Sequence, residues 1–289
     1  MRLRTLWETS VRRHPPELPD ALRALYGSDL VFPAQRTPYV YANFVASADG
    51  VVSFGVRGQA GGGTISGGNL GDRLGMALLR ARADAVLVGA RTLRAAGRPA
   101  LWDPAYTFPA ATTALRAWRR ARGLTDSPLL TVVTASGRLP LDYEVFHARG
   151  ARVLVLSSDG GAARLRAEAR RRGLKLELRV LAPVAGRMPV RAMLRLLARE
   201  FGVRMLLCEG GPTLFGELAR AGLVQELFLS VAPVLAGRNG RAPRPGPIVG
   251  AAFAPARAPR MRLLSVKAHG DLLLLRYRIT GSGARPSSR

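Results

Sequence analysis

The fold of this chain is decided by residues 203–222, VRMLLCEGGPTLFGELARAG. The run from Val203 to Cys208, apolar except for Arg204, is too short for a helix and is typical of a buried parallel strand. Pro212 suits the first position of a helix, because its missing N–H would be unpaired there. Gly222 follows the last apolar residues at helical spacing and indicates the helix end. The segment therefore predicts a strand, a tight turn and a helix.

The turn between this strand and helix, EGGPT, has the composition of an anion-binding site. Its two glycines let the backbone approach a ligand closely, and the start of a helix offers unpaired N–H groups and partial positive charge. Glu209 directly follows an apolar strand, where a buried carboxylate needs either a ligand or an arginine as its partner. The pattern predicts a bound phosphate at this turn and leaves the partner of Glu209 open.

The composition is that of a folded α/β protein with a large positive charge. With 289 residues, of which 48% are hydrophobic, the chain can bury a sizeable core. Its formal net charge of +25 invites a nucleic-acid-binding interpretation. Lys175 and Lys267 are the only lysines, however, and the arginines are scattered over predicted helices without interleaved aromatic residues. We therefore favour a solvated basic surface and keep a basic nucleic-acid-binding protein as an alternative.

Cysteine and histidine usage and the chain ends narrow the class of protein. Cys208, the only cysteine, falls in the predicted buried strand, and the three histidines have no ligand spacing, so neither a disulfide nor a metal site is predicted. No segment is apolar enough for a membrane span, and residues 1–15 lack a signal-peptide stretch, which predicts a cytoplasmic protein. We expect an N-terminal arm and linker (1–38), one domain (39–280) and a disordered tail (281–289).

Strands and helices alternate from residue 39 onward. The β-rich runs lie at 39–47, 85–89, 129–134, 152–156, 176–181, 203–208 and 225–231. This alternation predicts an α/β fold with a mostly parallel central sheet and helices on both faces. The last third differs, because MRLLSVK and DLLLLRYR flank AHG and predict a C-terminal antiparallel hairpin. The glycine-rich run at 58–68 is either a mobile lid, which we favour, or a flexible connection.

Polar residues gather in three loops, each directly after a predicted strand. The loops contain Asp49 with Ser47 and Gly50, then Gly89 with Thr92, then EGGPT. In parallel sheets ligands bind beyond the carboxyl ends of the strands, so we expect the loops to converge on one cleft. Each loop also has a plain structural interpretation, with Asp49 and Gly50 forming a tight turn and Thr92 capping a helix.

Two polar side chains outside these loops are ambiguous. Asn43, within the first long strand, either bonds neighbouring backbone or faces the cleft. Arg80, near the end of a helix, is by default a solvated cation. The common nucleotide motifs do not help, because no G-x-G-x-x-G follows a strand and no P-loop lysine is present.

Four motifs, taken in order, resemble one known family. They are NFVASADG (43–50), RARADAVLVGARTLRA (80–95), LLCEGGPTLFGEL (206–218) and LFLSVAPVLAGR (227–238). Together they resemble the reductase domain of bacterial riboflavin biosynthesis, the C-terminal half of a bifunctional deaminase–reductase. The deaminase half with its zinc ligands is missing, so the chain looks like a stand-alone reductase. The resemblance implies a dihydrofolate reductase-like fold, NADPH as cofactor and a homodimer formed through the C-terminal strands.

The resemblance also implies a reaction and a site. The reaction is reduction of the ribose of 5-amino-6-(5-phosphoribosylamino)uracil to the ribityl form, with Asp49 or a water held by Glu209 as proton source. Substrate-binding residues would be Asn43, Arg80 and Glu209. The cofactor would contact Val45, Ala46, Gly89, Thr92, Gly210, Gly211, Pro212, Thr213 and Leu214, with its adenosine 2′-phosphate at Ser136 and Arg138. We also expect Gly210→Val to weaken NADPH binding more than folding.

Two departures from the family pattern touch the predicted pocket. The acidic residues that usually follow the second motif are absent from AAGR (95–98), and Thr64 stands where a tryptophan is common. Because both departures change the predicted pocket, a dihydrofolate or other pteridine reductase is kept as an alternative function.

Overall fold

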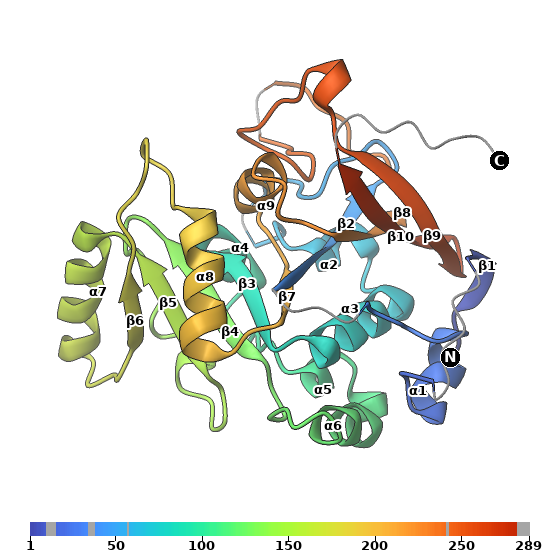
Figure 1. The fold of residues 1–289 in the computed structure, drawn as a ribbon, viewed down its shortest axis with the longest axis horizontal. Helices are drawn as coiled ribbons and strands as arrows, with labels where there is room; N and C mark the ends of the chain where they lie inside the picture. Colours follow the sequence, from blue (N-terminus) through green and yellow to red (C-terminus); the bar gives the residue numbers. More distant parts are fainter. Residues whose placement is uncertain (10–15, 34–37, 57, 241–242, 282–289) are drawn as a thin grey trace.

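The computed structural model describes residues 1–9, 16–33, 38–56, 58–240 and 243–281. Within them the strands form one 10-stranded sheet in the order β1-β9-β10-β8-β2-β7-β3-β4-β5-β6 (Figure 1). The strands are β1 (Arg4–Glu8), β2 (Tyr39–Ser47), β3 (Ala85–Gly89), β4 (Leu129–Thr134), β5 (Val153–Ser157), β6 (Glu177–Val180), β7 (Met205–Cys208), β8 (Glu226–Ala232), β9 (Arg260–His269) and β10 (Leu272–Gly281).

Most of this sheet is parallel. Each neighbouring pair from β8 through β2, β7, β3, β4 and β5 to β6 runs parallel. The remaining pairs, β8–β10, β10–β9 and β9–β1, are antiparallel. The predicted mostly parallel central sheet with a C-terminal antiparallel hairpin is confirmed.

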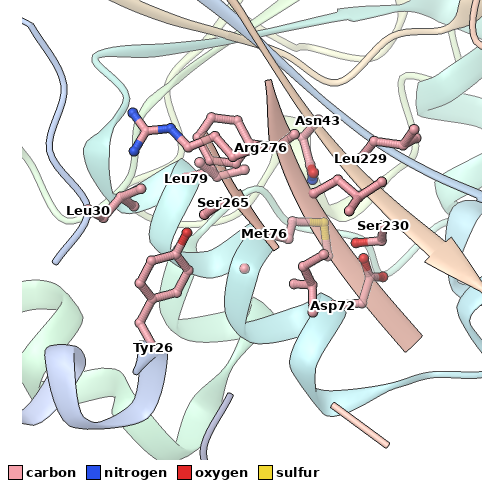
Figure 2. Close-up of a pocket in the computed structure, with 14 residues that line it drawn as sticks. Tyr26, Leu30, Asn43, Asp72, Met76, Leu79, Leu229, Ser230, Ser265 and Arg276 are labelled. Atoms are coloured by element: carbon pink, nitrogen blue, oxygen red, sulfur yellow. The ribbon is translucent and has the colours of Figure 1, made fainter. Parts of the chain in front are cut away.

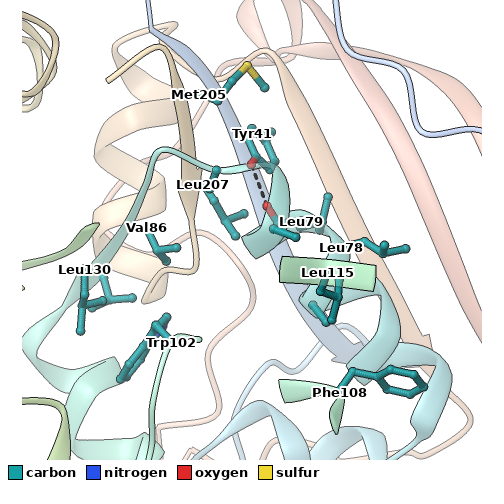
Figure 3. Packing of buried hydrophobic residues seen from close by; sticks show 14 of the residues in the cluster. Tyr41, Leu78, Leu79, Val86, Trp102, Phe108, Leu115, Leu130, Met205 and Leu207 are labelled. Atoms are coloured by element: carbon teal, nitrogen blue, oxygen red, sulfur yellow. Dashed lines mark hydrogen bonds between the residues drawn. The ribbon is translucent and has the colours of Figure 1, made fainter. Parts of the chain in front are cut away.

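Helices cover both faces of the sheet, as predicted (Figure 1). Apolar residues of α1, α3, α4, α6 and α7 join one core cluster, and those of α8 and α9 join a second cluster on the opposite face. Alternate residues of β2 supply both, with Tyr41 in the first and Ala42 in the second. Figure 3 shows part of the first cluster, where the Tyr41 hydroxyl donates a 2.8 Å hydrogen bond to the carbonyl of Leu79.

The described helices have the following bounds. The α-helices are α1 (Asp20–Tyr26), α2 (Gly62–Ser66), α3 (Leu70–Arg82), α4 (Ala90–Ala96), α5 (Pro104–Thr107), α6 (Thr112–Arg120), α7 (Asp159–Arg171), α8 (Val190–Phe201) and α9 (Pro212–Arg220), and the 3₁₀ turns are Pro109–Ala111, Glu144–Phe146 and Pro255–Arg257. None of these described helices has the length and apolar character that crossing a bilayer requires.

The decisive strand, turn and helix are present. The strand β7 is fully buried and begins at Met205, two residues later than predicted, and α9 begins at Pro212. Gly222, just past α9, has a φ of +67°, which L-residues with a side chain rarely adopt. The sheet therefore delivers the EGGPT turn to the carboxyl edge of its parallel strands.

One local expectation was wrong, and one strand was missed. The glycine-rich run at 58–68 contains the short helix α2, and its role as a lid stays a prediction. Thr92 does not open α4, because the helix begins at Ala90 with Gly89 at its N-cap. The strand β1 went unpredicted, because its five residues are mostly exposed and carry no apolar alternation.

The N-terminal arm (residues 1–38) is not a loose appendage where it is described. Strand β1 pairs with β9, and Leu22 of α1 is completely buried in the first core cluster. The residues expected to form a linker at 34–37, and those of the predicted disordered tail after Gly281, lie outside the described residues.

Candidate active site

The start of α9 is an open anion-accepting turn. Its N-cap, Gly211, offers no side-chain cap, and Pro212 occupies the first helical position. Gly211 and Pro212 are half-buried and Thr213 is exposed. The backbone N–H groups of the first turn therefore face a region that a ligand can reach, and the helix dipole adds partial positive charge there.

The loop after β3 meets this turn. The N–H of Gly89 donates a 2.8 Å hydrogen bond to the carbonyl of Gly210. A Cβ placed on Gly211 would lie 3.2 Å from the Thr92 hydroxyl oxygen, so the Thr92 side chain lies against this turn. Two of the three predicted loops thus meet, and the small size of glycine suits their close approach.

Arg80 and Glu209, both predicted to bind substrate, face each other. The Nε and Nη2 atoms of Arg80 donate to the two carboxylate oxygens of Glu209 at 2.7 Å each. The indole N–H of Trp102 donates to the same carboxylate at 2.8 Å, and Nη1 of Arg80 reaches the Thr107 hydroxyl at 2.7 Å. The Arg80 and Glu209 side chains are only 9% and 8% exposed. Glu209 therefore meets an arginine, which satisfies the carboxylate without a ligand.

The remaining predicted loop, which contains Asp49, bonds to the segment that follows β8. The Asp49 carboxylate accepts hydrogen bonds from the Ser47 hydroxyl at 2.5 Å and from the backbone N–H groups of Ala236 and Gly237 at 3.0 and 2.8 Å. These bonds hold the pKa of Asp49 well below its ordinary value, with the Ser47 bond as the largest cause. Asp49 anchors the segment that follows β8. An acid held ionised in this way is poorly suited to donate a proton near neutral pH.

The predicted 2′-phosphate loop borders an open pocket of about 720 Å³ at the end of β4. Ser136 and Arg138 both line it, and both are exposed. The loop is fixed by close backbone packing, since a Cβ on Gly137, whose φ is +68°, would lie 2.1 Å from the carbonyl oxygen of Gly161 in α7. The loop therefore holds its shape without a ligand.

Arginines dominate the lining of this pocket. Arg94, Arg138, Arg164 and Arg171 contribute to it, together with Glu168. Arg171 pairs with Glu168, and Arg94 donates to the carbonyl of Arg138 at 3.0 Å. Within the described residues, no hydrogen bond or ion pair is recorded for the guanidinium groups of Arg138 and Arg164. These two cations are available to an anionic ligand.

Asn43 lines a second, much smaller cavity of about 20 Å³ between α3 and the sheet, together with Asp72 (Figure 2). Asp72 is only 9% exposed. Burial raises the pKa of Asp72, while hydrogen bonds with the hydroxyls of Ser230 and Ser66 oppose that rise and the charge of Glu209 adds to it. The cavity therefore holds a buried acid that stays protonated to a higher pH than usual.

Sequence reasoning missed Asp72 as a functional candidate. Asp72 lies in the first turn of α3, three residues after the N-cap Asn69, whose side chain accepts from the N–H of Gly71 at 2.8 Å. The available signal was an acidic residue two positions before the buried Leu74 in α3. Whether Asp72 is buried depends on which elements pack against α3, and the sequence does not specify them.

The remaining predicted cofactor contacts, Val45 and Ala46, lie near the end of β2. A Cβ on Gly62, at the start of α2, would lie 2.8 Å from the Cγ1 atom of Val45, and one on Gly61 would lie 3.4 Å from the carbonyl oxygen of Ala95. The α2 segment thus lies between the ends of β2 and α4. The cofactor role of these two residues stays a prediction.

The chain is similar in sequence to two known reductases. A 2,5-diamino-6-ribosylamino-4(3H)-pyrimidinone 5′-phosphate reductase from Archaeoglobus fulgidus is 34% identical over 200 residues, covering 69% of this chain and 82% of the relative. The reductase of the same name from Methanothermobacter thermautotrophicus is 28% identical over 205 residues, covering 71% and 82%.

Solved structures share the fold. A pyrimidine reductase-like protein from Corynebacterium diphtheriae has a TM-score of 0.64 at 23% identity, with 84% of this chain and 92% of that chain covered. The riboflavin biosynthesis reductase of Saccharomyces cerevisiae has a TM-score of 0.56 at 17% identity, with 91% and 96% covered. Residues 38–275, which contain every loop of the site, match the RibD C-terminal domain, and the chain belongs to that family.

Proposed function

We propose that the chain is an NADPH-dependent reductase of riboflavin biosynthesis that reduces the ribose of a 5′-phosphorylated ribosylaminopyrimidine to the ribityl form. The alternative from another class, nucleic-acid binding by the basic surface, gains no support from a specific site in the described residues. Family membership supports a reductase, and a reductase of this kind implies a nicotinamide cofactor.

The observation that carries the proposal is a pair of anion sites on one edge of the sheet. The first turn of α9 follows β7, the arginine pocket follows β4, and β3 lies between these strands. Since neighbouring strands lie about 4.8 Å apart, the two sites are separated by roughly 10 Å at the level of the sheet. NADPH carries a pyrophosphate and a 2′-phosphate, and the residues present fit both groups.

When bound, NADPH supplies the hydride, and the protein supplies position and a proton. The N–H groups of α9 hold the pyrophosphate, and Arg138 and Arg164 hold the 2′-phosphate. Opening and reducing the sugar requires a proton at its ring oxygen or at the attached nitrogen. We assign this proton to Asp72, because its buried carboxyl keeps its proton to a higher pH than an ordinary aspartate and so can act as a general acid.

The proposal does not specify which pyrimidine ring the substrate carries. The archaeal relatives are named for a 2-amino pyrimidinone, whereas the sequence resemblance implies the 2-oxo uracil. Both compounds carry the same ribosylamine and 5′-phosphate, and the proposal rests on that shared part. Separate assays with the two pyrimidines determine which ring the pocket prefers.

Arg164→Ala should selectively weaken NADPH binding. A lost charge-assisted contact is worth about 1.5–3 kcal/mol, so we expect Kd for NADPH to rise about 10- to 100-fold while Kd for NADH hardly changes. Arg166→Ala is the matched control, because Arg166 is exposed on the same helix and does not line the pocket. Fluorescence titration of both cofactors measures the effect. Equal losses for NADPH and NADH would place the 2′-phosphate elsewhere.

Gly211 is a better probe of the pyrophosphate site than Gly210. Gly210 has a φ of +81°, and a Cβ there would lie 3.0 Å from the Phe44 ring, so Gly210→Val would strain the fold as well, and the expectation that it weakens NADPH binding more than folding stays a prediction. Gly211 has an extended backbone, and its Cβ would meet only the Thr92 hydroxyl at 3.2 Å. Gly211→Ala should raise Kd for NADPH at least tenfold, about 1.4 kcal/mol, with a smaller loss of unfolding free energy. Cofactor titration measures Kd, and urea denaturation measures the unfolding free energy. Unchanged NADPH affinity in the folded variant would contradict the placement of the pyrophosphate at this turn.

A homodimer through the C-terminal strands also stays a proposal. The outer edge of β9 is already paired with β1, so a second copy cannot extend the sheet there. Contact would involve the free edge of β1 or the exposed faces of β9 and β10. Light scattering measures the mass in solution.

The proposed function is tested by turnover. Purified protein with NADPH and a phosphorylated ribosylaminopyrimidine should consume NADPH, and dihydrofolate should be a much poorer substrate. Rapid turnover of dihydrofolate alone would favour a pteridine reductase. Salt-sensitive DNA binding without measurable NADPH affinity would favour a nucleic-acid-binding protein.

A further inference from the structure

The N-terminal arm lies outside the matched family domain, which begins at residue 38. It nevertheless contributes fully buried side chains to the main core, including Leu3, Leu22 and Leu30. Phe32 stacks among aromatic rings of the domain, with its centroid 5.0 Å from that of Tyr41. The arm is therefore part of the folded domain rather than a tether.

Two polar clusters hold the arm in place. Lys267 of β9, only 1% exposed, donates to the hydroxyls of Thr5 and Ser28 at 2.9 and 2.7 Å, and its ammonium lies 4.5 Å from the Tyr26 ring centre. Glu17 pairs with Arg82 of α3 at 2.9 Å. Because Lys267 and Arg82 belong to the matched domain and their partners to the arm, the two parts are joined by buried charges.

The same arm reaches the cavity that contains Asp72. Tyr26 and Leu30 line it together with Asn43, Asp72 and Met76, so arm and family domain share one wall (Figure 2). The cavity, at about 20 Å³, has room for little more than one water molecule. Removing either arm side chain would open it to water.

We propose that the N-terminal arm is a positioning element of the active site, in which Tyr26 and Leu30 seal the cavity and so keep the neighbouring Asp72 carboxyl out of water. Exclusion of water disfavours the charged form of a carboxyl and lets Asp72 hold its proton. The inference rests on the proposed function, because only a proton-donating role makes this device useful. Tyr26 and Leu30 act through Asp72 and touch no reacting atom.

The hydroxyl and charged groups around Asp72 do not substitute for the exclusion of water by the arm. The Ser230 hydroxyl of β8 and the Ser66 hydroxyl of α2 oppose the raised pKa of Asp72, and the Glu209 charge reinforces it less than burial does. Among the lining residues, the other charged or titratable groups are Arg276 of β10 and Tyr26 itself. Lys267, Glu8 and Glu226 lie around Tyr26 on the arm side. Burial raises the pKa of the Tyr26 hydroxyl to about 12, so it stays neutral across the working range. His269 of β9 faces Asn69, with 3.0 Å between its Nδ1 atom and the Asn69 amide oxygen.

The test is a titration of the Asp72 carboxyl in the full-length protein. The ¹³C carboxyl resonance of labelled aspartate, assigned by its loss in Asp72→Asn, reports protonation without any turnover. We expect the pH of half-titration to fall by about 1 in Tyr26→Leu and in Leu30→Ala, because each variant hydrates the cavity. Tyr26→Phe keeps the ring, and Leu22→Ala removes a buried side chain of α1 that does not line the cavity, so both should titrate like the wild type.

The pH profile of kcat gives a second readout, whose alkaline limb should move with the resonance. If Tyr26→Leu fails to fold, Leu30→Ala decides alone. An unchanged titration in the folded cavity variants, or an equal shift in Leu22→Ala, overturns the role of the arm and leaves the proposed function intact. Absence of turnover in the wild type rejects the proposed function, while the resonance still reports whether the arm protects Asp72.

Discussion

Arg80→Met should lower the free energy of unfolding by about 3–5 kcal/mol, because it leaves the Glu209 carboxylate buried without its cation. Both oxygens of that carboxylate are held by Arg80 at 2.7 Å, and among the described residues Trp102 is the one other side chain that donates to it. The loop after β7 is therefore fixed by this ion pair. Urea denaturation measures the loss.

Two comparisons make the test specific. Arg120→Met breaks the exposed pair with Asp126, whose side chains are 64% and 40% exposed, and should cost under about 1 kcal/mol. The double variant Arg80→Met with Glu209→Leu should recover much of the loss, because no unpaired charge remains. If Arg80→Met were no more harmful than Arg120→Met, the pair would not hold the loop, and the predicted substrate contact of Arg80 would be the better explanation.

Asp72→Asn should lower kcat by about 10²–10⁴-fold, the range typical for loss of a general acid. The amide keeps the size of the side chain but cannot donate the required proton in the same way. Steady-state assay with NADPH and the pyrimidine substrate measures the effect. Asp49→Asn is the informative comparison, and a loss of kcat in it as large as that in Asp72→Asn would return the proton-donor role to Asp49.

The two aspartates should also give opposite dependences of stability on pH. Because burial raises the pKa of Asp72 in the folded chain, its contribution to stability is complete below the ordinary aspartate pKa and is lost as pH rises through the raised value. Hydrogen bonds lower the pKa of Asp49, so its contribution is present above the ordinary value and is lost as pH falls through the lowered one. Urea denaturation of each asparagine variant across pH 3–9, flanking the ordinary pKa of about 4, separates them.

The part of the site that could be predicted from the sequence is the part made by backbone. The turn after β7 follows from local composition, since an apolar run, two glycines and a helix-starting proline leave few conformations. Its meeting with Gly89 follows from parallel topology, which places strand ends at one edge. Convergence of the Asp49 loop on the same cleft stays a prediction, because the contacts of its carboxylate are with the segment at Ala236.

What could not be predicted depends on contacts between distant side chains. Arg80 and Glu209 are 129 residues apart, and the sequence suggested a partner for each without indicating that they partner one another. Asp72 is unusual only because β8 and the arm cover it, and a five-residue strand such as β1 gains its place from β9 rather than from its own pattern. Burial of this kind is a property of the assembled sheet.

The most direct test follows the hydride itself. Protein incubated with NADPH deuterated at the transferable position of C4 and with the phosphorylated ribosylaminopyrimidine should yield a ribityl product that carries one deuterium at its C1 carbon, detected by mass spectrometry and NMR. A deuterium-free product, or no ribityl product from an enzyme that binds NADPH, would contradict the assignment of this fold to sugar reduction.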